Sequence, residues 1–261
     1  MTGFYANEWD ARVDLAAAHR LAVMYGFHEG IDNHLTLMVP GYDDRFFLTP
    51  FGLHWSEVKA SDFIIVDFDG NILEGDKNSL VESSAFHIHG PIHASQRQIP
   101  CVLHTHMPYA TALSMLEDPE LEMISQNAIS FKDQVFYDCE YRGLAYDKSE
   151  GERMATALGE KSVLLLRNHG IVTVGQSVGE AFHLLYFFER TAESHILAMS
   201  TGRPLRYVEK DIVDFTVDQF RGTTGAAGDG PAQMHFSGPS AELHFAALKR
   251  ILDRKEPDYA S

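Results

Sequence analysis

The chain has 261 residues, of which 45% are hydrophobic and 22% are charged, a composition typical of folded globular proteins and unlike that of disordered chains. Its formal net charge of −16, from 21 basic and 37 acidic residues, disfavours nucleic acid and anionic membranes as partners. We find no signal-peptide pattern, no apolar run near the roughly 20 residues of a membrane span, and no disulfide framework. We therefore expect a soluble, cytoplasmic protein.

The first part of the chain predicts a helix followed by a meander of short antiparallel strands. Apolar residues recur at helical spacing over residues 8–26, and Gly26 is a natural helix stop. A short helical piece is expected at 56–59. Alternating or apolar runs bounded by turn residues predict strands, at 33–39, 46–48, 63–67 and 71–73.

A histidine-rich segment comes next. Residues 82–97 predict a helix that Gly90-Pro91 would kink, because proline removes a backbone hydrogen bond. In such a helix one face would be shared by Glu82, Ala85 or Phe86, His89 and His93.

The second half of the chain predicts further helices and two apolar strands. The strands flank Asn168-His169-Gly170. The helices are expected at 108–117, 149–159 with Ser149 as N-cap, 177–201 and 239–255. Residues 203–238 carry little pattern, and FRGTTGAAGDGPAQM within them is typical of a flexible linker. We expect one domain over 1–205, then a C-terminal arm and helix over 206–261 that pack on the core or a neighbouring subunit.

Two histidines one residue apart end an apolar run just before Pro108. In a strand, residues i and i+2 point to the same face, so His104 and His106 can present both imidazoles to one point. Proline fits the first turn of a helix, which places the pair at the end of a strand. His169, in a polar turn between two apolar strands, is the best candidate for a third ligand. Three imidazoles leave open positions on a divalent ion, as in catalytic rather than structural sites.

The sequence resembles the class II aldolase and adducin head-domain family over about residues 10–205. The motifs that carry the resemblance are NHLT at 33–36, LTPFGLHWSEVKASDFIIVDFDG at 48–70, FHIHGPIH at 86–93, VLHTH at 102–106, ISQNAISF at 124–131 and VLLLRNHGIVTVG at 163–175. The resemblance implies an α/β fold, a three-layer α/β/α sandwich around a mainly antiparallel sheet, and homotetramers with active sites between subunits. It also implies that His104, His106 and His169 bind one divalent ion per subunit, zinc first, with Fe, Mn or Co as alternatives.

The sequence departs from the sugar-phosphate aldolases of that family at two places. Their glutamate base follows a Ser-Ser pair, whereas here Ala85 follows Ser83-Ser84. Their phosphate loop has Thr-Gly, whereas here it reads Phe51-Gly52, and an aromatic ring would fill space where a phosphate should sit. Asn33 remains. The residues expected to bind substrate are Asn33, Phe51, Gly52, Ser83 and Ser84.

At these two places the sequence resembles the adducin-like branch of the family. We expect a divalent-metal lyase, a decarboxylase or retro-aldol enzyme, that acts on a non-phosphorylated hydroxy- or oxo-acid. The alternatives are an Fe(II)-dependent oxygenase and a non-catalytic oligomerisation or binding module. The residues that could replace the missing glutamate are Glu82, His89 and His93, or a tyrosine such as Tyr137 or Tyr141 from a neighbouring subunit.

Overall fold

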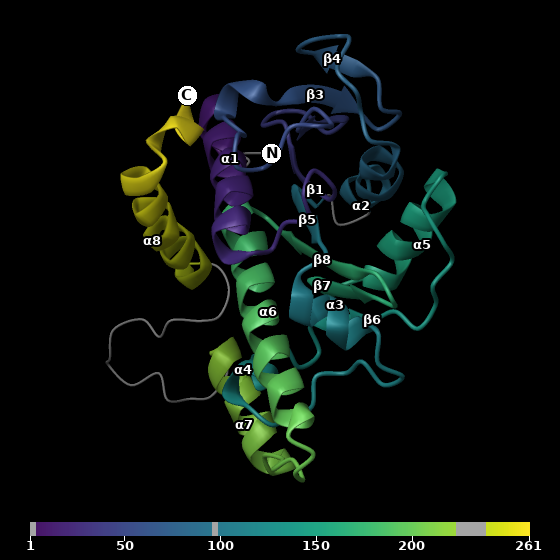
Figure 1. Ribbon diagram of the computed structural model, residues 1–261, viewed down its shortest axis with the longest axis vertical. Helices are drawn as coiled ribbons and strands as arrows, with labels where there is room; N and C mark the ends of the chain where they lie inside the picture. Colours follow the sequence, from purple (N-terminus) through teal and green to yellow (C-terminus); the bar gives the residue numbers. More distant parts are fainter. Residues whose placement is uncertain (1–3, 96–98, 223–238) are drawn as a thin grey trace.

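The computed structural model describes residues 4–95, 99–222 and 239–261, and these form one mixed eight-stranded sheet with helices on both faces (Figure 1). The sheet order is β4-β3-β2-β1-β5-β8-β7-β6, and all neighbouring strands are antiparallel except β6 and β7. The strands are β1 His34–Met38, β2 Arg45–Leu48, β3 Ile64–Asp67, β4 Ile72–Glu74, β5 Cys101–Thr105, β6 Val135–Tyr137, β7 Val163–Leu166 and β8 Gly170–Gly175. The expected three-layer sandwich with its N-terminal meander is confirmed.

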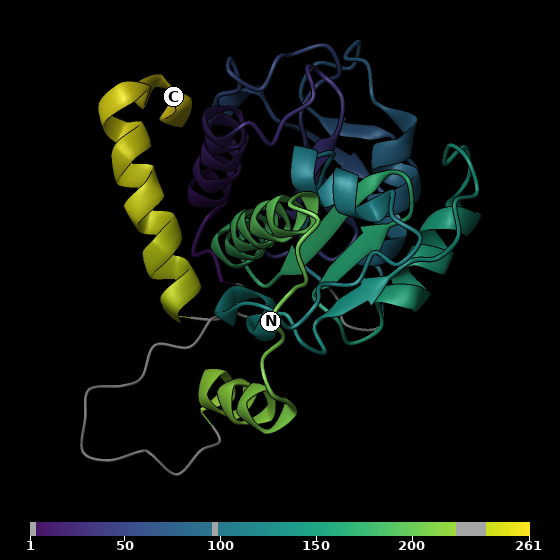
Figure 2. The ribbon, with the colours of Figure 1, turned by 60° about the horizontal axis from the view of Figure 1, so that its bottom comes forward.

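Helices cover the two faces of the sheet unequally. On one face α1 and α6 pack on the strands, and α8 packs outside them (Figures 1 and 2). On the other face lie η2, α2 and α5. The helical segments are α1 Glu8–Tyr25, η1 Ala60–Asp62, η2 Ala85–His89, α2 Gly90–His93, α3 Pro108–Ser114, α4 Gln126–Ser130, α5 Lys148–Leu158, α6 Val178–Ser200, α7 Lys210–Arg221, α8 Pro239–Lys255 and η3 Pro257–Ala260. No helix in these described ranges is both long and apolar enough to cross a bilayer.

Strand alternation assigns different side chains to the two faces. On β1, Leu35 and Leu37 join the large apolar cluster with α1 and α6. His34 and Thr36, at the intervening positions, are turned toward η2 and α2, where both make hydrogen bonds. The face covered by η2 and α2 therefore carries polar groups, and the candidate site lies on it.

Caps set the ends of the long helices. The Asn7 side chain accepts from the Asp10 N–H at the start of α1, and Gly26 ends that helix in the left-handed conformation. Ser177 caps α6 by accepting from the Glu180 N–H. Asp147 caps α5, so the prediction of Ser149 as its N-cap was wrong.

Several segments differ from the sequence prediction. Residues 56–59 do not form a helix, and the nearest helical turn is η1. The chain between 121 and 146, for which no element was expected, contains α4 and β6. Within 203–238, expected to lack pattern, Lys210–Arg221 forms α7, which packs on α4. Most of the expected linker, FRGTTGAAGDGPAQM, lies outside the described residues, and the division of the chain at 205 stays a prediction.

The histidine-rich segment is not one kinked α-helix. Residues 85–89 form a π-helical turn, η2, which continues into the short α2 with Pro91 near its start. Ala85 is fully buried and belongs to an apolar cluster with Phe46, Ile64 and Val66. A π-turn changes the side-chain directions of its residues, so Glu82 and Ala85 do not share the face that α-helical spacing predicted.

Buried neutral histidines make this fold sensitive to acid. Burial lowers the pKa of His19 to about 4, although its hydrogen bond to the Leu15 carbonyl partly opposes the shift. Since the folded pKa lies below the unfolded value of about 6.5, the unfolded chain takes up the proton first as pH falls. The stability that neutral His19 provides is complete above about pH 6.5 and is lost toward pH 4, with about 2 kcal/mol lost by pH 5.

We therefore expect His19→Gln to flatten the pH dependence of stability by about 2 kcal/mol between pH 7.5 and pH 5. Urea unfolding of both proteins at the two pH values measures this. Equal pH slopes for wild type and His19→Gln would contradict the assignment.

Candidate metal centre

Three imidazoles from distant parts of the chain meet at one edge of the sheet. His104 lies in β5, His106 follows the end of that strand, and His169 lies in the turn between β7 and β8. Their ring centroids are 4.8 to 5.0 Å apart, and one ligand nitrogen of each lies within 4.8 Å of the other two. The structure therefore brings together the three histidines that the sequence predicted as ligands.

The turn that carries His169 can approach β5 because residue 170 has no side chain. A Cβ at Gly170 would lie 2.6 Å from the Thr105 carbonyl oxygen and 2.7 Å from the His106 ring. Asn168 adopts a φ of 53°, in the left-handed region that asparagine tolerates better than most residues. The Asn-His-Gly sequence thus supplies both the turn and the close approach.

The second nitrogen of two of these rings has a partner that orients it. His104 Nδ1 lies 2.9 Å from the Ile171 carbonyl oxygen and donates to it, which leaves Nε2 free. His106 Nδ1 is hydrogen-bonded to the Glu29 carboxylate. His106 Nε2 is buried and has no hydrogen-bond partner among the described residues. A histidine held by a carboxylate, with a bare nitrogen turned inward, is the usual arrangement of a metal ligand.

The electrostatic environment keeps two of the rings neutral. Burial lowers the pKa of His104 well below its usual value, and the neighbouring His169 and His106 lower it further. Burial also lowers the pKa of His169 to about 4, with His106 and His34 adding to the shift. Neutral imidazole is the form that binds a metal through its lone pair. The donor set therefore fits Zn²⁺, and it also suits Fe²⁺, Mn²⁺ or Co²⁺.

A cavity of about 330 Å³ opens onto the three rings. Glu82, Ser83 and Ser84 lie in its wall, just before η2. Asn33 also lines it, and its side-chain oxygen accepts a hydrogen bond of 3.1 Å from the His106 backbone N–H. These four residues, all predicted from the sequence, therefore share one cavity with the metal ligands, as does Tyr141.

Sequence reasoning missed His34, which lies opposite His104 where β1 pairs with β5. The two rings are 5.5 Å apart between centroids. His34 Nε2 is 2.9 Å from the Ser84 hydroxyl and 3.5 Å from the Glu82 carboxylate. Its neighbour Asn33 was singled out, and strand alternation could have placed His34 on the site face.

Sequence reasoning also missed three arginines in the cavity wall, of which Arg153 pairs with Asp138 and Glu150. The loop 138–146 contributes Arg142, which pairs with Glu140. Arg167 lines the cavity and pairs at 3.0 Å with Glu117, whose side chain is 96% exposed. The position of Arg167 directly before Asn-His-Gly was the available signal, whereas the loop has no periodic pattern.

Other candidates lie elsewhere. His89 and His93 are buried, and neither lines the cavity among the described residues. Phe51, 37% exposed, lines a separate cavity of about 20 Å³, which also borders Asn33 and Glu82. Gly52 lines neither cavity within the described part of the chain.

The two tyrosine candidates differ in their position relative to the metal cavity. Tyr141 lines the metal cavity and is 54% exposed. The hydroxyl of Tyr137 accepts a hydrogen bond from the Leu121 N–H, and this side chain is absent from the cavity lining that the described residues form. Tyr141 is thus the better placed of the two.

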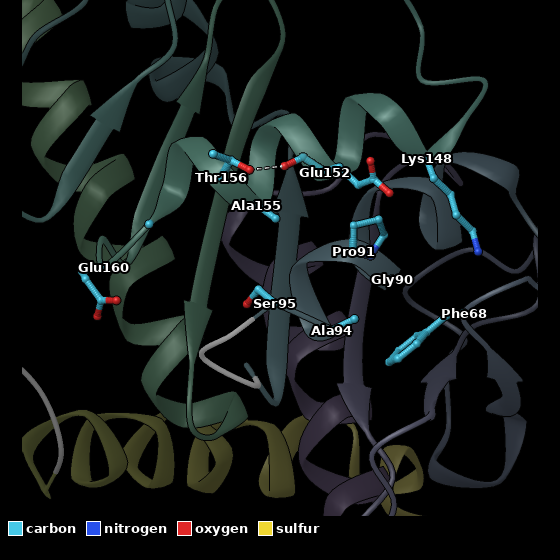
Figure 3. A pocket seen from close by; sticks show the side chains of 11 residues that line it. Phe68, Gly90, Pro91, Ala94, Ser95, Lys148, Glu152, Ala155, Thr156 and Glu160 are labelled. Atoms are coloured by element: carbon cyan, nitrogen blue, oxygen red, sulfur yellow. Dashed lines mark hydrogen bonds between the residues drawn. The ribbon is translucent and has the colours of Figure 1, made fainter.

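A larger cavity of about 680 Å³ lies between α2 and α5 (Figure 3). Lys148 in its wall pairs with Asp69, and the Thr156 hydroxyl donates to the Glu152 carbonyl. Its described lining contains no imidazole, and several of the residues in it are small. It is therefore not part of the metal centre.

Comparison with known proteins identifies relatives of the whole chain. Residues 13–196 match the family model described as Class II Aldolase and Adducin N-terminal domain. Alpha-adducin of Mus musculus is 35% identical over 246 residues, which are 93% of this chain and 33% of that protein.

Solved structures with the same fold superpose on most of this chain. An aldolase II superfamily protein from Pseudomonas syringae superposes with a TM-score of 0.86 at 36% identity, over 98% of this chain and 97% of that one. L-fuculose 1-phosphate aldolase from Glaciozyma antarctica superposes with a TM-score of 0.81 over 99% and 96% of the two chains. At 21% identity, this second similarity supports the fold alone.

Proposed function

Because the chain belongs to the class II aldolase and adducin N-terminal domain family, we propose that it is a divalent-metal-dependent lyase that acts on a non-phosphorylated hydroxy- or oxo-acid. The observation that carries the proposal is the convergence of His104, His106 and His169 beside a cavity with an acidic side chain in its wall. Three protein ligands leave positions open for a substrate, as catalytic sites require.

The three histidines would hold the ion through one nitrogen each, with Glu29 and the Ile171 carbonyl fixing two of the rings. A bound divalent ion, zinc in the first instance, would supply Lewis-acid polarisation of a carbonyl or carboxylate oxygen and so would favour cleavage of a carbon–carbon bond next to a carbonyl group.

Two features of the cavity support an acid as substrate. Arg142 and Arg167 can bind a carboxylate by paired N–H donors. Their present partners, Glu140 and Glu117, are exposed, so water can solvate those carboxylates when a substrate takes their place.

Glu82 is the residue we propose for proton transfer. Ser84 donates a hydrogen bond of 2.5 Å to its carboxylate, and His34 Nε2 lies 3.5 Å away. Burial would raise the pKa of Glu82, but the hydrogen bonds and charge of His34 together with Ser84 outweigh burial and hold it below the usual value. The carboxylate can then take a proton from a substrate hydroxyl and return one to carbon. Tyr141 is the second proton donor that the cavity offers.

Glu82→Gln is expected to lower kcat by about 10² to 10⁴-fold, the usual contribution of a general acid or base, and to leave metal content unchanged. Release of carbon dioxide or of a carbonyl product from a panel of hydroxy- and oxo-acids measures turnover. Glu74→Gln, in an exposed carboxylate on β4, is the matched control. Full activity in Glu82→Gln would show that another group transfers the proton.

Two other functions have their own support. The similarity to alpha-adducin favours a non-catalytic binding module, and the neutral histidines also suit an Fe(II)-dependent oxygenase. Anaerobic purification followed by metal analysis distinguishes them. Bound iron together with substrate-dependent oxygen consumption would favour the oxygenase over the lyase. A metal-free protein without turnover would favour the binding module.

We also propose that the protein forms a homotetramer, and sedimentation velocity measures this oligomeric state.

A further inference from the structure

A line of buried hydrogen bonds crosses the face of the sheet behind the metal centre. His93 Nδ1 lies 2.7 Å from the Ile99 carbonyl oxygen, and its Nε2 lies 2.8 Å from the Thr36 hydroxyl. The same hydroxyl lies 2.7 Å from His89 Nδ1. Thr36 thus bridges two imidazoles that follow one another across the junction of η2 and α2.

The line continues to the cavity wall. His89 Nε2 lies 3.1 Å from His34 Nδ1, and His34 Nε2 lies 2.9 Å from the Ser84 hydroxyl. Ser84 in turn contacts the Glu82 carboxylate. We call the residues from His93 through Thr36 and His89 to His34 the histidine chain.

The inner members of the histidine chain are shielded from water. Thr36 and His89 are 0% exposed, and His93 is 2% exposed. Burial lowers the pKa of His93 to about 4 and that of His89 well below its usual value. Each of these two rings is therefore neutral and carries a single N–H, whose position its partners must decide.

Counting donors and acceptors from the inner end fixes that position. The Ile99 carbonyl can only accept, so His93 carries its proton on Nδ1 and offers a bare Nε2 to the Thr36 hydroxyl. The hydroxyl has one proton to donate, and its oxygen must then accept from His89 Nδ1. The Val102 carbonyl, at 3.3 Å, is a second acceptor for the hydroxyl, and donation there also leaves the oxygen to accept from His89.

Donors and acceptors are assigned in the same way from His89 to His34. With its proton on Nδ1, His89 has a bare Nε2, which can only accept from His34 Nδ1. We propose that Thr36 and His93 act as positioning residues that keep a proton on His34 Nδ1, so that His34 Nε2 faces Ser84 and Glu82. This assignment rests on the proposed function in one respect, namely that Glu82 transfers the proton.

The test is the position of the ring protons, read by NMR of the whole protein labelled with ¹⁵N-histidine. Each ring is assigned by the loss of its signals in its own His→Gln variant. In the wild type we expect protonated Nδ1 in His34, His89 and His93. A wild type in which His34 or His89 has a bare Nδ1 would overturn the proposal.

Thr36→Val removes the bridging hydroxyl and keeps the shape of the side chain. A buried N–H without an acceptor is costlier than a bare nitrogen, so His89 should move its proton to Nε2 and donate to His34. We expect the Nδ1-protonated forms of His89 and His34 to fall about tenfold or more, and Thr36→Ser to restore them. Unchanged proton positions in a folded Thr36→Val would overturn the proposal.

Thr105→Val is the matched control. The Thr105 hydroxyl is equally buried on the neighbouring strand, and it has no hydrogen-bond partner in the described part of the chain. Its loss should leave the histidine chain unchanged. The measurement is made with and without added Zn²⁺. Failure of the lyase would show as absent zinc-dependent turnover with the proton positions intact, whereas failure of the positioning role would show as altered positions with zinc still bound.

Discussion

His106→Ala is expected to remove the bound metal, from about one ion per chain to below about a tenth of an ion after dialysis, because two imidazoles cannot hold a divalent ion against buffer. His106 is the ring whose Nε2 is buried without a partner in the described residues, so nothing else nearby uses that nitrogen. Elemental analysis gives the stoichiometry, and competition with a chelator gives the affinity. Turnover is expected to fall with metal content.

Glu29→Gln is the matched variant for this experiment. It keeps the ring of His106 and replaces its charged acceptor with a neutral amide, so zinc affinity should fall about 10- to 100-fold, the usual cost of losing an outer partner. The side chains of His106 and Glu29 are 25% and 58% exposed, so neither change should unfold the protein, and a thermal melt checks this. Stoichiometric zinc in His106→Ala would refute the assignment of this ligand.

The metal ligands were within reach of the sequence because strand geometry is local. Alternation alone places His104 and His106 on one side, and apolar strands on both sides of Asn168-His169-Gly170 require a tight turn. What alternation cannot supply is the pairing of β5 with β8, which joins residues far apart in the chain. The family resemblance supplied that step, and the structure agrees with it.

The supporting residues were less accessible for physical reasons. Side-chain direction in residues 82–93 depends on the π-turn, which helical periodicity of 3.6 residues cannot detect. α-Helical spacing therefore placed His89 and His93 on a face with Glu82, whereas in the fold they bond to Thr36. α7 was missed because its residues follow a segment without pattern, and it is held by packing against α4.

Ala85 offers the sharpest test of how this chain differs from the sugar-phosphate aldolases. The resemblance places their glutamate base at this position, so Ala85→Glu is the obvious way to restore it. Here Ala85 is 0% exposed, packs in the cluster with Phe46, Ile64 and Val66, and is not among the described residues that line the cavity. A carboxylate at this position would be buried among the apolar groups of that cluster.

We expect Ala85→Glu to lower the free energy of unfolding by about 3–5 kcal/mol and to give no gain in turnover, because an uncompensated buried charge and the added volume both destabilise the core. Urea unfolding at pH 7.5 measures the change. Ser83→Glu is the matched control, since Ser83 is exposed in the cavity wall two residues earlier, and its stability should stay within about 0.5 kcal/mol of wild type. If Ala85→Glu were as stable as Ser83→Glu and more active than wild type, the segment would have turned residue 85 into the cavity. In that case Glu82 would act as the base only in the wild-type protein, where residue 85 is a buried alanine.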